Sequence, residues 1–497
     1  MVAYIPPKQA GKYKAVASGA ITNGKPVFVH TDGTVKQVSQ TVDEATQALG
    51  TNLVFESGTT NTISGIFDST NNKVVLVYSD GSNSGYSTVV VCTIASNGSM
   101  SKGTPVVYAS HGAGGHQAIG YLGSGKVALF YKDDSGNNGG IIIGTVSGTT
   151  VGSFGSAVEF TPKNVRDTSV AYDTSTSRLV MAYRDGDTDK GVVRVASISG
   201  TTPTFGSEAF FHNAATNTGV AIAFDSNSNK IVIAYADGAD SSKGKAIVGT
   251  VSGTSISFGS EVEFESGTTR HVGLTFDSTN NKVIVAFEMT GGGDTNNGKA
   301  RVGTVSGTSI SFGTVTGFTA NNSYFDSLGF PIAHDSNANK IVIAYPDQAD
   351  GFDGEFTIGT VSGTDISFST IYGVDFETDT VEHVALVFDS NVNKFAIAWR
   401  DGGNSNYGTV RSLQVAYSNT TNTLTSENYI GIASGGTYAD TAEATIDVVG
   451  TVNKDQSGLT AGQTYYVQND GTLGTSADDP SVVAGTAISA TELIVKG

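Results

Sequence analysis

The feature that most constrains the fold of this chain is a unit that recurs seven times. Its clearest copy, residues 224–238, reads Phe-Asp-Ser-Asn-Ser-Asn-Lys-Ile-Val-Ile-Ala-Tyr-Ala-Asp-Gly. A basic residue opens the second apolar run of each copy, at spacings of 52 to 58 residues: Lys73, Lys126, Arg178, Lys230, Lys282, Lys340 and Lys394. Repeats of this length are typical of propellers, solenoids and arrays.

Each copy contains four short apolar runs separated by Gly, Asn, Asp and Ser. In the fourth copy these runs are residues 220–224, 231–235, 246–251 and 256–264. Four short antiparallel strands per unit are the signature of a propeller blade, and the apolar residues show no helical period of 3.6. The pattern therefore predicts an all-β chain containing a seven-bladed β-propeller.

The sequence also predicts how the ring closes. Residues 55–60, Phe-Glu-Ser-Gly-Thr-Thr, repeat residues 264–269, which end a fourth strand and enter the next unit. Residues 52–56 should therefore be a fourth strand that lies ahead of the first blade and completes the seventh. This closure would cover the open edges of both terminal strands.

The two ends of the chain share a different layout. Residues 24–35 and 462–473 each read as a strand, an Asp-Gly turn and a second strand. We predict that the ends are halves or copies of one small β module into which the propeller is inserted. The predicted segments are 1–50 for the amino-terminal part, 51–427 for the propeller and 428–497 for the carboxy-terminal part.

The carboxy-terminal segment carries a recognisable set of motifs. They are Asn-Tyr-Ile-Gly-Ile-Ala at 428–433, Gly-Leu-Thr-Ala-Gly-Gln-Thr-Tyr-Tyr-Val at 458–467 and Val-Ala-Gly-Thr-Ala at 483–487. This segment resembles a module of structural proteins of tailed bacteriophages, especially at the ends of tail-fibre and virion surface proteins of marine phages. The resemblance implies a virion setting, with other capsid or tail proteins as partners and a symmetric homo-oligomer. It implies little about chemistry.

Composition narrows the classes of function. The formal net charge is −18, from 28 basic and 46 acidic residues, which argues against a nucleic-acid binder because that class needs a basic surface. No apolar run reaches the 18 or so residues of a membrane span, and residues 1–8 lack the layout of a signal peptide. Cys92 is the single cysteine, so no intrachain disulfide can form. We expect synthesis in a host cytoplasm, exposure on a virion and no membrane insertion.

The loops divide into a variable set and a uniform set. Those after the second strand and between units differ from copy to copy and should open on one face, whereas Asp-Ser-x-x-Asn-Lys and Ser-Gly-Thr turns recur on the other. Variable loops on a rigid scaffold are where binding usually occurs. The predicted ligand-binding residues are Arg184, Asp185, Asp237, Asp347, Trp399, Arg400 and Asp401. Among them, Trp399 beside Arg400 resembles a glycan-contact pair.

Two patterns raise the question of metal binding. Asp185, Asp187 and Asp189 alternate in one loop, as ligands of Ca²⁺ often do, although acidic residues there also simply make turns. His116, His271 and His383 each lie six residues before the end of the first strand of their unit, where the third unit has Asp167. Three imidazoles at equivalent places would suit a metal, but their distant units favour a polar channel lining instead.

The sequence contains few signs of a catalytic site. The chain lacks a Gly-x-Ser-x-Gly elbow, a His-Glu-x-x-His motif and a Walker loop, and no carboxylate pair stands out. Aromatic residues keep one register in every unit, which favours packing between blades: Tyr78, Tyr131, Tyr183, Tyr235, Phe287, Tyr345 and Trp399. We therefore expect no enzymatic activity and no cofactor, apart from the calcium ion considered above.

Three hypotheses follow. The first is a phage virion protein, a tail fibre or surface decoration, that anchors through its terminal module and displays the propeller to a host-cell surface glycan or protein. The second is a virion-associated polysaccharide-degrading enzyme that uses loop carboxylates such as Asp185, Asp237 or Asp401. The third is a capsid or tail decoration protein with a purely structural role.

Overall fold

The computed structural model describes residues 11–30, 32–38, 41–42, 48–112, 117–133, 136–291, 294–319, 329–368, 373–415, 417–418, 424–468, 471–477 and 481–496. The chain divides into two compact units, which we call the terminal domain (Met1–Gln47 and Val415–Gly497) and the repeat domain (Ala48–Gln414). These boundaries differ from the predicted ones mainly in assigning 415–427 to the terminal domain. Among the described residues, no helix is long and apolar enough to cross a membrane.

The repeat domain consists of antiparallel strands grouped in units that follow the sequence repeats. Units 2 and 6 each form a five-stranded sheet, whereas units 3 to 5 share a 13-stranded sheet and units 7 and 1 share a nine-stranded sheet. Unit 1 contains β6 (Leu53–Asp68), β7 (Lys73–Asp80), β8 (Tyr86–Ile94), β9 (Met100–Lys102) and β10 (Val106–Gly112). Unit 2 contains β11 (Ala118–Tyr121), β12 (Lys126–Asp133), β13 (Asn138–Ser147), β14 (Thr150–Phe154) and β15 (Val158–Thr161). Unit 3 contains β16 (Val165–Asp173), β17 (Arg178–Asp185), β18 (Lys190–Ser199), β19 (Thr202–Phe205) and the start of β20 (Ala209–Asp225).

The remaining units follow the same order. Unit 4 contains the end of β20, β21 (Lys230–Asp237), β22 (Lys243–Ser252), β23 (Ser255–Phe258) and the start of β24 (Val262–Asp277). Unit 5 contains the end of β24, β25 (Lys282–Gly291), β26 (Asp294–Ser306), β27 (Ser309–Phe312) and β28 (Thr316–Gly317). Unit 6 contains β29 (Ile332–Asp335), β30 (Lys340–Asp347), β31 (Asp353–Ser362), β32 (Asp365–Phe368) and β33 (Val374–Glu377).

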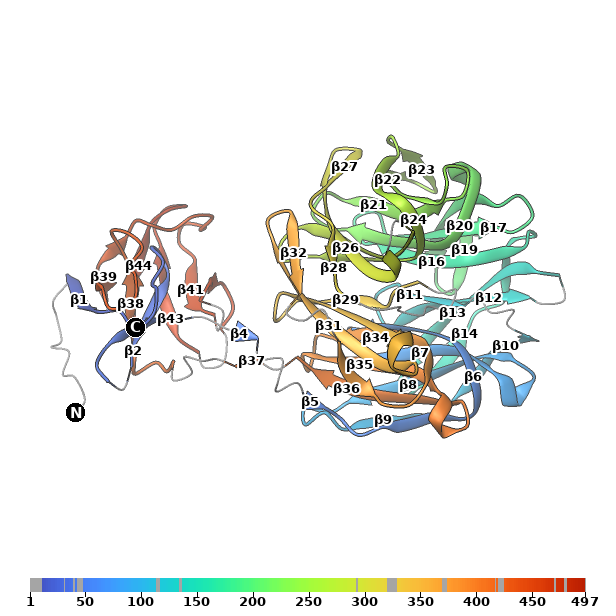
Figure 1. Ribbon diagram of the computed structural model, residues 1–497, viewed down its shortest axis with the longest axis horizontal. Coiled ribbons are helices and arrows are strands. Elements are labelled where there is room, and N and C mark those ends of the chain that lie inside the picture. The colour runs from blue at the N-terminus through green and yellow to red at the C-terminus, as the bar shows by residue number, and fades with distance from the viewer. Residues whose placement is uncertain are drawn as a thin grey trace. The chain divides into compact units, whose positions relative to one another are not determined.

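Unit 7 closes the ring. It contains β34 (Val381–Asp389), β35 (Lys394–Asp401) and β36 (Tyr407–Gln414), and β36 pairs with β5 (Ala48–Leu49) and with the start of β6. The predicted closing strand at 52–56 is therefore confirmed, and blue β6 lies beside orange β36 in Figure 1. The first strands of neighbouring units contact one another in a closed cycle, β6–β11–β16–β20–β24–β29–β34–β6. This cyclic arrangement of antiparallel sheets is a β-propeller, as predicted.

The uniform turn has a clear local cause. In unit 4, Oδ1 of buried Asp225 accepts hydrogen bonds from the backbone N–H groups of Asn227 and Ser228 at 2.9 and 3.0 Å. Asn229, the residue before the basic residue, has φ of 53°, a left-handed conformation that asparagine tolerates better than most residues. The motif Asp-Ser-x-x-Asn-Lys thus specifies the hairpin between the first and second strands.

Aromatic side chains join neighbouring units. Tyr235 of unit 4 packs on Phe211 from the fourth strand of unit 3, with ring centroids 5.1 Å apart. Equivalent pairs have centroids 5.2 to 6.3 Å apart: Phe55–Tyr78, Tyr108–Tyr131, Phe160–Tyr183, Phe264–Phe287, Phe318–Tyr345 and Phe376–Trp399. The prediction that the aromatic register serves packing between units is confirmed.

The terminal domain combines both ends of the chain in two five-stranded sheets. The first has the order β1 (Lys12–Val16), β39 (Glu443–Val448), β38 (Tyr429–Ala433), β2 (Pro26–Val29) and β3 (Val35–Gln37). The second has the order β40 (Val452–Asn453), β44 (Leu493–Val495), β43 (Val483–Ala487), β41 (Thr464–Val467) and β42 (Leu473–Gly474). Figure 1 shows blue β1 and β2 among the red strands of this domain. A short pair, β4 (Thr41–Val42) and β37 (Tyr417–Ser418), also belongs to it.

The two predicted terminal hairpins take equivalent places in these sheets. The β2–β3 hairpin pairs with β38, and the β41–β42 hairpin pairs with β43. Phe28 of the first hairpin and Tyr465 of the second lie in one apolar cluster. The terminal domain is thus built from two copies of one strand arrangement, and the repeat domain interrupts the first copy between β3 and β38.

Candidate functional site

The predicted loop aspartates hold turns. Asp185, Asp237, Asp347 and Asp401 end the second strands of their units and are buried. Each accepts backbone N–H groups of the following loop, at 2.8 to 3.2 Å. Asp347 and Asp401 cap the short helices η3 (Gln348–Asp350) and η4 (Gly402–Asn404), as Asp80 caps η2 (Gly81–Asn83). These four residues are therefore explained by their role in forming turns. Because their carboxylates are buried, they do not support the predicted contact with a ligand.

The three aspartates of the predicted calcium site have separate partners in this structure. The Asp185 carboxylate accepts the Thr188 hydroxyl at 2.9 Å, and Asp187 accepts the backbone N–H of Asn164 at 3.2 Å. Asp189 lies 3.8 Å from a nitrogen of Arg184. Since the three carboxylates point to separate partners, they are absent from the one set of converging metal-ligand atoms among the described residues.

Trp399 is also not a ligand contact. Its side chain is 0% exposed and packs on Phe376 at the junction of units 6 and 7. The prediction that Trp399 stacks on a glycan is wrong, because the aromatic position of every unit faces the neighbouring sheet. Its neighbour Arg400 alternates to the other face of the strand and reaches the mouth of the ring, as described below.

A cavity of about 280 Å³ lies on the axis of the ring. Residues from the first strands of all the units line it, among them Ser64, Gln117, Asp167, Gly219 and Gly329. In each unit, one position lies six residues before the last residue of the first strand. The residues described at this position all have a positive φ: Thr62, Asp167, Gly219, His271, Gly329 and His383. The predicted His116 at this position lies outside the described residues. The backbone bulges there, so this position forms a rim that we call the mouth.

Pairs of ionisable side chains occupy the mouth in units 3, 5 and 7. In unit 3, Arg184 Nε lies 3.1 Å from Asp167 Oδ2, and both side chains are largely buried. In unit 5, His271 Nε2 lies 3.4 Å from Glu288 Oε2. In unit 7, Arg400 lies 2.8 Å from Glu382 and donates to Asn61 of unit 1 at 3.2 Å.

Burial shifts the acidity of two carboxyl groups of the mouth. Desolvation raises the pKa of Asp167 to about 6, although Arg184 and Arg166 oppose the shift. Desolvation raises the pKa of Glu288 to about 7, with Arg270 opposing it. Carboxyl groups with raised pKa values in a concave site are typical of binding and catalytic centres.

The sequence placed some of these residues correctly and missed others. Arg184 and Arg400 were predicted on this face, and the shared register of Asp167, His271 and His383 was recognised. The loss of the Asp-Gly pair at residues 288–290 favoured binding in unit 5, but Glu288 was not among the predicted site residues, although it occupies in unit 5 the register of Arg184 and Arg400. Comparing that register in every unit would have found it, because the described chain has Ser79, Lys132, Arg184, Ala236, Glu288, Pro346 and Arg400 there.

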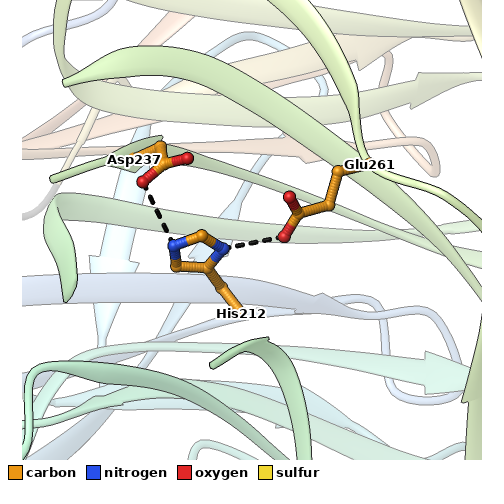
Figure 2. Close-up of side chains that lie close together, drawn as sticks. All are labelled: His212, Asp237 and Glu261. Carbon is orange, nitrogen blue, oxygen red and sulfur yellow. Dashed lines mark hydrogen bonds and ion pairs between the residues drawn. The ribbon is translucent and has the colours of Figure 1, made fainter. Parts of the chain in front are cut away.

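A second cluster lies where units 3 and 4 meet. His212 of β20 lies between Asp237 at the end of β21 and Glu261 just before β24 (Figure 2). Among the described residues, this is the one group whose potential metal-ligand atoms all lie within 4.8 Å of one another. The sequence prediction did not single out His212 or Glu261.

Comparisons with known proteins give distant resemblances in structure. No family model matches the chain, and no curated protein matches it. A protein from Lactobacillus plantarum is 12% identical, with 71% of this chain and 96% of that chain covered and a TM-score of 0.43. AofleA from Arthrobotrys oligospora is 9% identical, with 73% and 97% covered and a TM-score of 0.40. Trypanosoma rangeli sialidase is 10% identical, with 82% and 60% covered and a TM-score of 0.38.

Proposed function

We propose that this protein is a virion attachment protein of a tailed phage, whose propeller binds a host-surface glycan at the mouth of its central cavity. The observation that carries the binding role is that charged residues break the repeat at the mouth. The virion setting rests on the motifs at 428–433, 458–467 and 483–487. A terminal domain that contains both chain ends and an inserted propeller fits an anchor that displays a binding domain.

The charges of the mouth are not needed to build the ring. Where unit 3 has Asp167 and Arg184, unit 4 has Gly219 and Ala236, and unit 6 has Gly329 and Pro346. Taking charges out of water costs several kcal/mol per ion before pairing offsets it. Because unit 4 keeps the same strand pairing across the bulge without such charges, we attribute the charges in units 3, 5 and 7 to ligand binding.

The chemistry of the mouth suits a hydroxyl-rich ligand. Arginine offers several fixed N–H donors, and the carboxyl groups of Asp167 and Glu288 both accept and, when protonated, donate. The cavity volume of about 280 Å³ is just below the range of small-molecule sites, about 300 to 1,000 Å³. Such a cavity fits the tip of a glycan, with the rest of the chain contacting the surrounding loops.

Two arginines at opposite ends of strand β17 provide a matched test. Arg184 lies at the mouth, and Arg178 begins the same strand beside the uniform turns. Binding of the full-length protein to host cells and to their extracted surface glycans should weaken at least tenfold in Arg184→Met and stay unchanged in Arg178→Met. Equal binding by folded samples of both variants and the wild type would contradict a site at the mouth.

One observation favours a second candidate, polysaccharide cleavage. Glu288 has a pKa raised to about 7, which suits a general acid near neutral pH. Incubation with host polysaccharide and measurement of reducing ends over time separates the two functions. Binding without release supports the attachment role, whereas release that Glu288→Gln abolishes while binding persists would establish the enzyme.

A further inference from the structure

His212 joins two units through two carboxylates. It lies on the part of β20 that belongs to unit 3, where it pairs with Gly191, and its side chain is 8% exposed. Its Nδ1 lies 2.7 Å from Glu261 Oε1, and its Nε2 lies 3.1 Å from Asp237 Oδ1 (Figure 2). Both carboxylates belong to unit 4, so the imidazole bridges the junction.

The hydrogen bonds assign the protons of this cluster. The Tyr235 hydroxyl lies 2.5 Å from Glu261 Oε1 and donates a hydrogen bond to it. Since Glu261 Oε1 is an acceptor, His212 Nδ1 must carry a hydrogen to bond it. In the neutral imidazole, the lone pair then lies on Nε2, facing the Asp237 carboxylate.

That contact needs a cation. Buried His212 Nε2 makes no hydrogen bond of acceptable geometry, despite lying 3.1 Å from Asp237 Oδ1. Two acceptor atoms at this distance in a buried place repel each other unless a positive charge lies between or beside them. Backbone N–H groups of Ala239 and Asp240 donate to Oδ1, and no hydrogen bond reaches Asp237 Oδ2 in the described part of the chain.

The preceding junction has the same arrangement of two carboxylates and a tyrosine, with a lysine side chain as the cation. Between units 2 and 3, the Lys163 ammonium lies 3.4 Å from Asp185 and 2.7 Å from Glu208. Asp185 and Glu208 are the equivalents of Asp237 and Glu261, and Tyr183 donates to Glu208 as Tyr235 does to Glu261. Thr161 stands in the place of His212.

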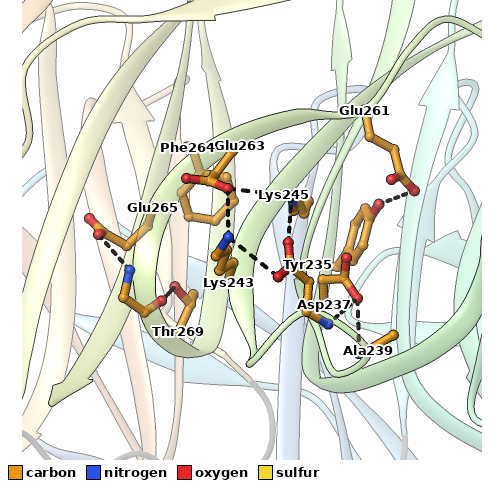
Figure 3. Close-up of polar contacts among 12 residues, drawn as sticks. Tyr235, Asp237, Ala239, Lys243, Lys245, Glu261, Glu263, Phe264, Glu265 and Thr269 are labelled. Atoms are coloured by element: carbon orange, nitrogen blue, oxygen red, sulfur yellow. Dashed lines mark hydrogen bonds and ion pairs between the residues drawn. The ribbon is translucent and has the colours of Figure 1, made fainter.

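The junction between units 3 and 4 has no such lysine. Ala214 occupies the place of Lys163. In the described structure, Lys243 and Lys245 form ion pairs with Glu263 (Figure 3). Both lysines also pair with Asp240. Among the described residues, His212 is therefore the one side chain that forms ion pairs with the Asp237 and Glu261 carboxylates.

We propose that a divalent transition-metal ion of the Zn²⁺ type binds between His212 Nε2 and the Asp237 carboxylate. At metal–ligand distances of about 2.0 to 2.2 Å, neighbouring ligand atoms of a tetrahedral site lie about 3.3 to 3.6 Å apart. The 3.1 Å between His212 Nε2 and Asp237 Oδ1 is a few tenths of an ångström shorter, so a small side-chain movement would admit the ion. A nitrogen and a carboxylate suit Zn²⁺ better than Ca²⁺, which prefers oxygen ligands throughout. Glu261 orients the imidazole through Nδ1, as outer carboxylates of metal-bound histidines do, and water completes the coordination.

The test uses full-length protein freed of metal by a chelator and dialysis. Isothermal titration with Zn²⁺ should show one saturable site per chain, with a matching rise in melting temperature, and Ca²⁺ should show neither. His212→Lys should bind Zn²⁺ at least a hundredfold more weakly while remaining folded, because its ammonium can replace the ion as Lys163 does. His30→Gln, in the terminal domain, is the control and should bind as the wild type does.

A second variant guards against misfolding. Asp237→Asn keeps an oxygen for the N–H groups of Ala239 and Asp240 but loses the charge, so it should weaken Zn²⁺ binding at least tenfold. Two results would overturn the proposal. One is unchanged Zn²⁺ affinity in folded His212→Lys and Asp237→Asn. The other is an absence of saturable binding by the wild type, which would mean that a proton on His212 fills the site.

Discussion

The junctions between units and the mouth of the ring follow opposite rules. At each junction, an aromatic ring of one unit meets an aromatic ring of the next, and the side chains differ little around the ring. At the mouth, register-equivalent positions hold glycine, threonine, aspartate or histidine. The junctions repeat because every pair of sheets must pack in the same way, whereas a ligand touches each unit differently.

This difference separates stability from binding. Trp399 and Arg400 are adjacent in the sequence, yet the first lies wholly in a junction and the second at the mouth. Strand alternation sends them to opposite faces. Changes at junction positions should therefore alter the free energy of unfolding, and changes at mouth positions should alter ligand affinity.

The largest effect expected at a junction is that of Trp399→Ala. Removing this fully buried indole should lower the free energy of unfolding of the repeat domain by about 3 to 5 kcal/mol. Urea unfolding followed by circular dichroism measures this loss. Under conditions where the variant is still folded, its glycan affinity should match that of the wild type. A stable variant with lost binding would break the distinction between the two regions.

A smaller effect is expected at the uniform turns. Asp225→Ala removes the carboxylate that accepts the N–H groups of Asn227 and Ser228, which should cost about 1 to 2 kcal/mol of unfolding free energy. The same urea measurement applies, with Ser226→Ala in the same turn as the control. Weaker glycan binding by folded Asp225→Ala would place the ligand on the face of these turns and contradict the account.

The buried carboxyl groups of the mouth should make the free energy of unfolding depend on pH. The folded pKa of Glu288, about 7, lies above the value of about 4.3 for an unperturbed glutamate, so the folded state favours the protonated form. Protonated Glu288 therefore contributes to the free energy of unfolding below about pH 4. This contribution, about 1 kcal/mol after allowance for solvent screening, is lost as the pH rises to about 7. Asp167 acts in the same direction up to its pKa of about 6.

Glu288→Gln isolates this effect. The variant should flatten the fall in unfolding free energy between pH 4 and pH 7, as measured by urea unfolding at several pH values. Glu263→Gln, at a partly exposed site on β24, should leave the fall unchanged. An identical pH profile in Glu288→Gln and the wild type would show that Glu288 is not desolvated at the mouth.

The repeat made most of the propeller predictable from the sequence. Turn residues such as Asn229 and strand-ending residues such as Asp225 are local signals, and the copy at 55–60 revealed the closing strand because it repeats 264–269. The terminal domain was less accessible. Its two sheets share a strand order, but the first is assembled from residues more than 400 positions apart, such as Lys12 and Asp447, and no local pattern specifies that pairing.

The site was predicted less well, for a physical reason. Residue type and loop position identified Asp185, Asp187 and Asp189 as candidate calcium ligands. However, the carboxylate oxygens of acidic side chains in a tight turn accept hydrogen bonds from nearby N–H groups. The side chains of Trp399 and Arg400 point to opposite faces of the strand, so only Arg400 lies at the mouth. This direction depends on the strand register. His212 and Glu261 belong to different units, so their approach became visible only once the sheets were packed together.

The most direct test of the central claim is a crystal structure of the full-length protein soaked or co-crystallised with a host glycan that it binds. The account predicts that the end of the glycan enters the axial cavity, with sugar hydroxyls within hydrogen-bond distance of Arg184, Asp167 or Glu288. A glycan bound at the uniform turns or at the terminal domain, with the mouth empty at saturating concentration, would contradict it.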